Sequence, residues 1–194
     1  MKTQVLLAGS MMLFGAAAYA QEVETPKVEV GLNYSYSRIY PGGGLTGYNA
    51  NGGYGYAEYN VNKVLGLVAD LGASSTGNIN GVSVNNTTFE YLFGPRFNWR
   101  HSRFTPYVQT LFGGMRFTNG INPVTGYPGI GTSQNNFAAA FGGGLDVAVN
   151  NHLALKPFQV DYLITQVSPG SGIPNNLVNG LRYSAGVVFR FGSK

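Results

Sequence analysis

The sequence contains no cysteine. A chain without thiols forms no disulfide and offers no thiolate as a nucleophile or a metal ligand. Charged residues are also scarce, at 10% of the chain, against about 25% in ordinary soluble domains. The net charge of +4 is small and scattered along the chain, and this distribution gives no reason to expect nucleic acid as a partner.

Histidine is nearly absent as well, since the chain has only His101 and His152. Neither has a carboxylate beside it in the sequence, so the pair defines no metal site. No phosphate-binding loop of the form G-x-x-x-x-G-K-[ST] occurs. We therefore expect no metal, no cofactor and no catalytic residue.

Long apolar runs are confined to the N-terminus. Lys2 precedes a mostly apolar stretch over residues 5–19, and Ala18-Tyr19-Ala20 is a small-x-small pattern before Gln21. This arrangement is typical of a secretory signal peptide, and the stretch is short for a membrane helix, which needs about 20 apolar residues. We predict a signal peptide over residues 1–20, which is cleaved, and a single exported domain over residues 21–194.

The chain is rich in glycine and in aromatic residues, with 29 Gly, 13 Tyr and 12 Phe. The mean hydropathy is −0.02, too low for a helical membrane protein. A transmembrane β-barrel combines an apolar outer face with a polar interior, and these two faces average to such a value.

Alternation between apolar and other residues is clearest near the C-terminus. Every second residue from Tyr183 to Phe191 is apolar, and this period of two predicts a β-strand with one lipid-facing side. The same alternation recurs along the chain. The eight predicted strands cover residues 28–38, 53–62, 64–74, 88–100, 104–117, 136–149, 152–166 and 180–191.

The predicted strands alternate between three short turns and four long loops, which cover residues 39–52, 75–86, 118–135 and 167–179. This is the plan of an all-β fold, an eight-stranded antiparallel up-and-down transmembrane β-barrel with short periplasmic turns and longer external loops. Two strands look irregular. We predict a bulge in the strand over 104–117, where the alternation is weak, and another at Pro157-Phe158, where the phase of the alternation slips.

Charged residues follow the alternation. No charge falls in the middle of a strand on the apolar face, where Arg or Lys would cost about 2–4 kcal/mol at the bilayer midplane. We expect a lumen filled with side chains and a structural ion-pair network in it, because unpaired buried charges are costly. A proton or ion path, or a catalytic site, is the functional alternative. The residues of the predicted network are Glu29, Glu58, Asp70, Glu90, Arg96, Asp146, Lys156, Asp161, Arg182 and Arg190.

The remaining basic residues of the predicted barrel lie at strand ends or turns, namely Arg38, Lys63, Arg100, Arg103 and Arg116. A soluble lipocalin-like barrel has the opposite polarity, with an apolar interior, and the charge placement argues against it. Tyrosines near the strand ends could form interfacial girdles, while a few of them point inward instead, Tyr54 and Tyr56 most clearly. The tyrosines in question are Tyr34, Tyr36, Tyr54, Tyr56, Tyr59, Tyr91, Tyr107, Tyr162 and Tyr183.

The stretches over residues 58–63, 65–70 and 156–162 resemble outer-membrane β-barrel proteins like the OmpA transmembrane domain. We expect no peptidoglycan-binding domain after the barrel, so the resemblance is to the small opacity and OmpX-like, porin-type barrels. The resemblance implies a Gram-negative outer membrane and outer-membrane lipid as surroundings. It also implies recognition by the barrel-assembly machinery through an assembly signal in the last strand, at Tyr183, Val187, Phe189 and Phe191.

Several functions remain open at this point. We expect a structural role in envelope integrity. The alternative is surface adhesion or recognition, with a host or phage ligand at the four external loops, because rigid scaffolds often present function on loops. A small pore and a lipid A-modifying enzyme are further alternatives. The enzyme is disfavoured because His101 and Ser102 are adjacent, and their side chains diverge in an extended segment.

Overall fold

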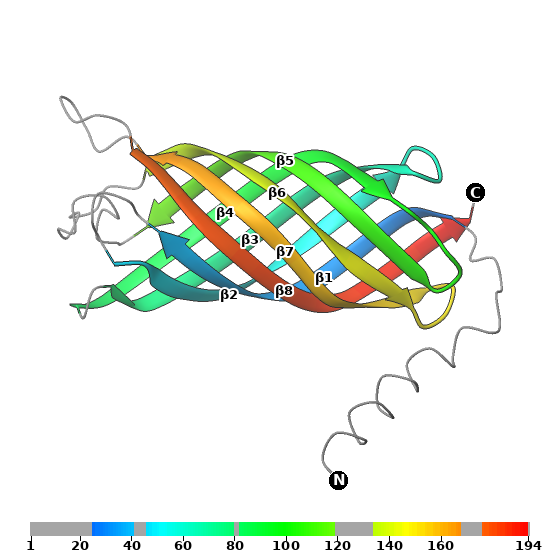
Figure 1. Cartoon of the computed structure of the whole chain (residues 1–194), viewed down its shortest axis with the longest axis horizontal. Coiled ribbons are helices and arrows are strands. Elements are labelled where there is room, and N and C mark those ends of the chain that lie inside the picture. Colours follow the sequence, from blue (N-terminus) through cyan, green and yellow to red (C-terminus); the bar gives the residue numbers. More distant parts are fainter. Residues whose placement is uncertain (1–24, 41–45, 80–81, 119–133, 168–175, 194) are drawn as a thin grey trace, which may run out of the picture.

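The computed structural model describes residues 25–40, 46–79, 82–118, 134–167 and 176–193. These residues form eight strands, each antiparallel to its neighbours, and β1 pairs with β8 to close a barrel (Figure 1). This confirms the predicted fold class. Among the described residues, no helix is long and apolar enough to cross a membrane. The strands are β1 (Pro26–Tyr40), β2 (Tyr48–Asn60), β3 (Leu65–Ile79), β4 (Val82–Asn98), β5 (Phe104–Thr118), β6 (Gln134–Ala148), β7 (Leu153–Val167) and β8 (Asn176–Ser193).

The three short turns lie at one end of the barrel, which we call the turn end; we call the opposite end the loop end (Figure 1). Two of these turns share one construction. Asn62 Oδ1 accepts hydrogen bonds of 2.8 Å from the backbone N–H groups of Val64 and Leu65. Asn150 Oδ1 repeats this arrangement with the N–H groups two and three residues later, also at 2.8 Å. An Asn side chain of this kind substitutes for a backbone partner, so each Asn fixes a tight reversal.

The strands are longer than predicted at the loop end. The predicted loop over residues 75–86 is wrong, because β3 continues to Ile79 and β4 begins at Val82. The predicted loop over 39–52 is too long as well, because β2 begins at Tyr48. The extension of β3 carries polar residues on both faces, with Ser75 exposed and Thr76 buried, so the backbone pairing continues there although neither face is apolar. The predicted signal peptide and the central parts of all four predicted loops lie outside the described residues.

The two predicted bulges have different outcomes. The bulge in β7 is confirmed, because the pairing with β8 shifts between Lys156 and Gln159. The bulge in β5 is wrong, since this strand keeps a single register with β4 and with β6. Its alternation is weak for another reason: the inward-facing Leu111, Met115 and Phe117 are buried and apolar, so both faces of β5 look alike in the sequence.

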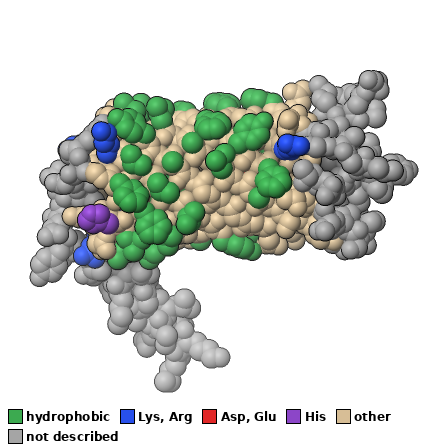
Figure 2. All heavy atoms as spheres, turned by 180° about the vertical axis from the view of Figure 1, so that it is seen from behind, with side chains coloured by type: hydrophobic (Ala, Val, Ile, Leu, Met, Phe, Trp, Pro, Cys, Tyr) green, Lys and Arg blue, Asp and Glu red, His purple; other side chains and the backbone are tan. Residues whose placement is uncertain are grey.

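The outer wall of the barrel is apolar. Large hydrophobic side chains are exposed along all eight strands, and Figure 2 shows them distributed over the wall, with basic side chains only near the two ends. Six of the predicted girdle tyrosines are exposed on this wall. Tyr54 and Tyr56 point into the lumen as predicted, and Tyr107 is a third inward tyrosine, which is only 2% exposed. Tyr107 lies two residues before the inward-facing Gln109 and therefore shares its face.

Candidate functional site

The candidate site is the network of side chains that fills the lumen. The alternation of each strand turns one charged residue after another inward, and the closed barrel brings residues from distant strands together. The structure places the carboxyl, guanidinium and ammonium groups of all ten predicted residues inside. Nine are at most 2% exposed, namely Glu29, Glu58, Asp70, Arg96, Asp146, Lys156, Asp161, Arg182 and Arg190, while the side chain of Glu90 is 11% exposed.

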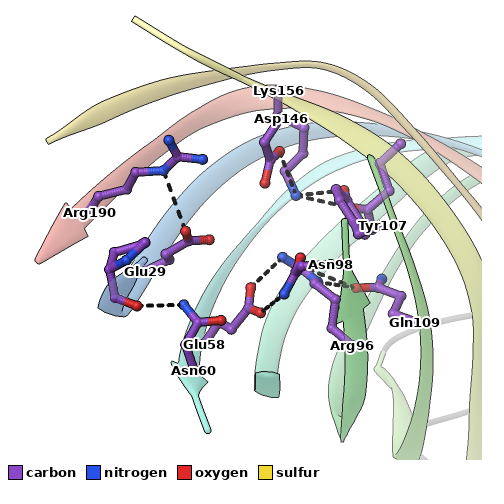
Figure 3. A network of polar contacts seen from close by, with 12 residues as sticks. Glu29, Glu58, Asn60, Arg96, Asn98, Tyr107, Gln109, Asp146, Lys156 and Arg190 are labelled. Carbon is purple, nitrogen blue, oxygen red and sulfur yellow. Dashed lines mark hydrogen bonds and ion pairs between the residues drawn. The ribbon is translucent and has the colours of Figure 1, made fainter. Parts of the chain in front are cut away.

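Arg96 on β4 reaches across to β2 and β5. Its Nη1 lies 2.9 Å from Glu58 Oε2, and its Nε and Nη2 donate to Gln109 Oε1 at 3.0 and 2.8 Å. Asn98 donates from Nδ2 to the second oxygen of Glu58 at 2.7 Å (Figure 3). Both oxygens of the Glu58 carboxylate therefore have partners, as a buried charge requires.

Lys156 on β7 is the second buried cation. Its Nζ lies 3.6 Å from Asp146 Oδ1, and it donates to Tyr107 Oη at 2.7 Å and to Gln159 Oε1 at 3.0 Å (Figure 3). Tyr107 in turn donates its hydroxyl proton to Gln159 Oε1 at 2.5 Å. The ammonium group thus donates two hydrogen bonds and has the Asp146 carboxylate as its ion-pair partner.

Two tyrosine rings hold the two cations in place. The guanidinium carbon of Arg96 lies 4.4 Å from the centre of the Tyr56 ring and 4.3 Å from that of Tyr107. Lys156 Nζ lies 4.4 and 4.5 Å from the same two centres. Ring faces attract cations, with a gain of about 2 kcal/mol or more in desolvated sites. The two rings therefore offset part of the repulsion between the two cations, which lie close together in the lumen.

Arg182 on β8 organises a second cluster nearer the loop end. Its guanidinium lies 2.9 Å from Asp161 Oδ2, 3.1 Å from Asp70 Oδ2 and 2.5 Å from Glu90 Oε1. The ring of Tyr54 covers it at 4.3 Å. One cation thus connects acidic residues of three other strands, β3, β4 and β7.

Glutamine side chains join the two clusters. Gln109, which accepts from Arg96, donates from Nε2 to Asp161 Oδ1 at 2.9 Å. Gln159, which accepts from Lys156, donates to Asp161 Oδ2 at 2.6 Å. A continuous set of polar contacts therefore runs from Glu58 through Arg96 and Gln109 to Arg182. The alternation predicts that both glutamines point inward, but neither carries a charge, and neither is among the predicted network residues.

A third group of contacts lies at the turn end. Glu29 Oε1 lies 3.2 Å from Arg100 Nη1 and 3.4 Å from Arg190 Nε. Arg100 also donates to Asn60 Oδ1 at 2.8 Å. We predicted Arg100 at a turn, and its part in the lumen was missed. The sequence contains a signal for this position. Arg96 and Asn98 point inward, and Arg100 follows Asn98 by two residues, so the alternation places it on the same face.

The model of the family described as "Outer membrane protein beta-barrel domain" matches residues 6–191. The chain belongs to this family. It therefore lies in the outer membrane, and in such barrels the short turns face the periplasm while the longer loops lie outside. No curated protein matches this outer-membrane barrel.

Solved structures support the same fold. Neisserial surface protein A is 13% identical with a TM-score of 0.63, covering 85% of this chain and 97% of its own. Ail, the attachment invasion locus protein of Yersinia pestis, is 17% identical with a TM-score of 0.51, covering 86% and 99%. OprG from Pseudomonas aeruginosa is 10% identical with a TM-score of 0.54, covering 88% and 98%. Identities this low show a shared barrel and nothing more.

The lumen of this outer-membrane barrel is not uniformly polar. An apolar cluster also fills part of it, with Leu92, Leu111, Met115, Leu163 and Val178 buried together. The cavity left beside Met115 and Glu90 has a volume of about 20 Å³, room for about one water molecule. Buried polar residues such as Thr88, Asn136 and Thr165 lie near the loop end as well, so the interior there is mixed.

The residues of the predicted assembly signal lie on the outer face of β8. Tyr183, Phe189 and Phe191 are 46%, 40% and 53% exposed, and Val187 is partly exposed. β8 pairs along its length with β1, from Val28 opposite Phe191 to Tyr36 opposite Tyr183. The last strand thus presents an aromatic stripe to lipid and closes the barrel.

Histidines lie apart from the lumen network of the outer-membrane barrel. His101 and His152 are both exposed and both belong to the short turns. In the part of the chain that the structure describes, no three His, Asp or Glu side chains come together in a way that could hold a metal ion.

Proposed function

We propose that this outer-membrane barrel has a structural role, supporting the integrity of the cell envelope, and that its lumen is closed by its own side chains. The observation that carries this proposal is the stack of Arg96, Lys156, Tyr56 and Tyr107, four large side chains, each at most 3% exposed, packed against one another inside the barrel. A barrel of eight strands has an interior just wide enough for side chains to fill.

Cross-lumen ion pairs give this role a physical basis. The pair Arg96–Glu58 joins β4 to β2, and Arg182 joins β8 to β3, β4 and β7. The ties of β4 to β2 and of β8 to β3 and β4 join strands that are not neighbours, and such ties resist flattening of the barrel, which the ladder of backbone hydrogen bonds alone does not. Removing one partner of such a buried pair leaves an uncompensated charge, which destabilises the fold by about 3–5 kcal/mol.

Planar-bilayer recording combined with a deletion strain tests the proposal. The purified barrel should give no steady conductance, and the deletion strain should become sensitive to detergents and to large antibiotics that an intact outer membrane excludes. The chain expressed in trans should restore resistance. A stable conductance at physiological salt, or a deletion strain with an unchanged envelope, would contradict the structural role.

A second candidate function, surface adhesion or recognition, is supported by the length of the strands. A transmembrane β-strand needs about 9–11 residues, whereas β3 has 15 and β4 has 17. Several outward-facing residues near the loop end are polar and exposed, including Asn49, Asn51, Ser75 and Arg116. Such extensions would raise the connecting loops above the membrane surface.

Loop exchange separates the two functions. Replacing the segments 41–45, 119–133 and 168–175 by short Gly-Ser connectors should leave envelope resistance intact and abolish adhesion to host cells or phage adsorption. Unchanged binding by the exchanged barrel would exclude recognition through these segments. The proposal contains no catalytic step, so we expect the lipid A of the deletion strain to be unaltered.

A further inference from the structure

The cluster around Arg182 contains more acidic than basic groups. Its single guanidinium lies within 3.1 Å of three carboxyl groups, those of Asp70, Glu90 and Asp161. If all three were ionised, one positive charge would face three negative charges in a buried volume. Excess charge of one sign is costly away from water. The cluster therefore needs a further positive charge.

No other side chain near the cluster supplies that charge. Arg96 and Lys156 lie in the neighbouring cluster, and each has a carboxylate of its own. The other basic residues of the strands near the loop end, Arg38 and Arg116, occupy outward-facing positions. The rest of the loop end contains no charged residue in its sequence, namely in segments 41–45, 80–81, 119–133 and 168–175.

The hydrogen bonds of the cluster are distributed unequally. Asp161 accepts one from Gln109, one from Gln159 and two from Arg182, at 2.6 to 3.1 Å. Asp70 accepts only one, from Arg182 Nη2 to Oδ2 at 3.1 Å. Its Oδ1 is buried and has no hydrogen-bond partner among the described residues. A carboxylate is far more costly to bury without donors than a neutral carboxylic acid, so Asp70 is the acid of this cluster least suited to ionisation.

The surroundings of Asp70 also disfavour a negative charge on it. The two tyrosines nearby stay neutral at ordinary pH, since the hydroxyl of a free tyrosine has a pKa of about 10. The facing carboxylates then outnumber the guanidinium by two to one. Carboxylates that share a small site do not all ionise readily. The groups facing Asp70 are Tyr54 and Tyr56 on β2, Glu90 on β4, Asp161 on β7 and Arg182 on β8.

Water reaches this cluster from the loop end. Glu90 is paired with Gly72, two residues beyond Asp70 on β3, so Glu90 lies nearer the loop end than Asp70. The side chain of Glu90 is 11% exposed, against 1% for Asp70. The cavity of about 20 Å³ beside Glu90 has room for about one water molecule, and Ser37, Ser74 and Thr88 also line it. On the other side of the cluster, the stacked cations and tyrosine rings fill the lumen.

We propose that Asp70 is a proton-binding site, which holds a proton on Oδ1 in a mildly acidic medium and exchanges it with water outside the cell. The proton passes between Asp70 and external water by way of Glu90 and the cavity beside it. A metal ion needs several ligands, and the described residues offer no such group, whereas a proton needs a single oxygen. The barrel thereby responds to the pH outside the cell. This proposal depends on the closed lumen and not on the structural role in the envelope.

The pH dependence of unfolding tests the site. The parent barrel and Asp70→Asn are refolded in phosphatidylcholine vesicles and unfolded in urea between about pH 5 and about pH 8. An unfolded aspartate has a pKa of about 3.9, so the unfolded chain has lost this proton throughout the range, while the folded barrel holds it at the acidic end. The unfolding equilibrium constant of the parent, divided by that of Asp70→Asn, should rise by up to about tenfold per pH unit and become constant once the proton has left.

A matched substitution separates the neutral acid from the ionised one. At about pH 5, Asp70→Asn should unfold within about threefold of the parent, because asparagine resembles the protonated acid in shape and charge. Asp161→Asn should raise the unfolding equilibrium constant by about a hundredfold or more, because it removes an ionised partner of a buried guanidinium. Infrared spectra of the parent at the same pH should show the carbonyl band of a protonated carboxyl, which shifts in D₂O and is absent in Asp70→Asn.

Three results would overturn the proposal. The first is a parent barrel with the same pH dependence of unfolding as Asp70→Asn. The second is a loss of stability in Asp70→Asn as large as that in Asp161→Asn, including failure to fold, which would make Asp70 an ionised partner of Arg182. The third is the absence of the infrared band at about pH 5. If parent stability then increased with sodium concentration at constant ionic strength, a small cation would balance the cluster instead of a proton.

Discussion

The guanidinium carbon of Arg96 lies 4.3 Å from the centre of the Tyr107 ring. On the same ring lies Lys156 Nζ, at 4.5 Å. Two buried cations thus share one aromatic side chain, and Tyr107 Oη also accepts a hydrogen bond from Lys156. The ring combines an apolar body, which fills the lumen, with a hydroxyl that takes part in the polar network.

We expect Tyr107→Ala to destabilise the barrel by about 3–5 kcal/mol, the usual cost of removing a buried aromatic ring, because both cations lose a ring face. Tyr107→Phe should cost less, since it keeps the ring and removes only the hydroxyl. Urea unfolding of the barrel in phospholipid vesicles measures both. Tyr162→Ala is the control, since Tyr162 is 42% exposed on the outer wall. Equal losses in the Phe and Ala variants would assign the stabilisation to the hydroxyl instead.

Removal of Arg182 should be the most damaging single change in the network. Arg182→Met leaves Asp70, Glu90 and Asp161 without their shared cation, and breaking a buried ion pair by removing one partner costs about 3–5 kcal/mol. The same urea measurement checks this. Arg103→Gln should change stability by less than about 1 kcal/mol, because exposed charges contribute little. A loss in Arg182→Met no larger than that of Arg103→Gln would contradict the structural importance of the cluster.

Much of this architecture could be predicted from the alternation of residue types. The inward positions of Glu58, Asp70 and Arg96 follow from period two, because a charge on the lipid face is too costly. The alternation no longer identifies a strand where the outer face does not contact lipid, because a polar or charged residue there carries no such cost. Beyond the membrane, in the extension of β3 to Ile79, neither face needs to be apolar, and the strand looks like a loop.

The partners inside the lumen could not be predicted in the same way. Alternation gives the direction of each side chain but not the register between strands, and the register decides which residues meet. Arg182 contacts Asp70, which is 112 residues away in the sequence, only because the barrel closes. The apolar cluster at Leu111 and Met115 was hidden as well, because an apolar residue on the inner face weakens the very pattern that identifies the strand.

Glycines on the inner face are expected to be irreplaceable where a large side chain takes their space. A Cβ at Gly31 would overlap the ring of Tyr56, which lies against both Arg96 and Lys156. Gly31→Ala should therefore cost about 1–3 kcal/mol, the range for an overpacked core. Gly55→Ala is the matched control, since its Cβ would meet Leu32 Cδ2 at 3.4 Å and Gly31 O at 3.6 Å, which are ordinary contact distances. Equal stability of the two variants in urea unfolding would show that the Tyr56 ring moves aside without cost.

The aromatic residues at the end of β8 should matter for assembly more than for the stability of the finished barrel. Phe189 and Phe191 face lipid and have no partners in the lumen network, so the double variant Phe189→Ser and Phe191→Ser should still refold in detergent micelles. In cells it should accumulate poorly in the outer membrane, because the proposed recognition by the assembly machinery is lost. The measurement compares heat-modifiable folded protein in outer-membrane fractions with the folded yield in vitro. Phe141→Ser is the control, since Phe141 is 42% exposed on the wall of β6 and removes a similar lipid contact outside the last strand. If both proteins reach the outer membrane equally well, the terminal strand carries no assembly signal, and its aromatic stripe serves only as part of the lipid-facing wall.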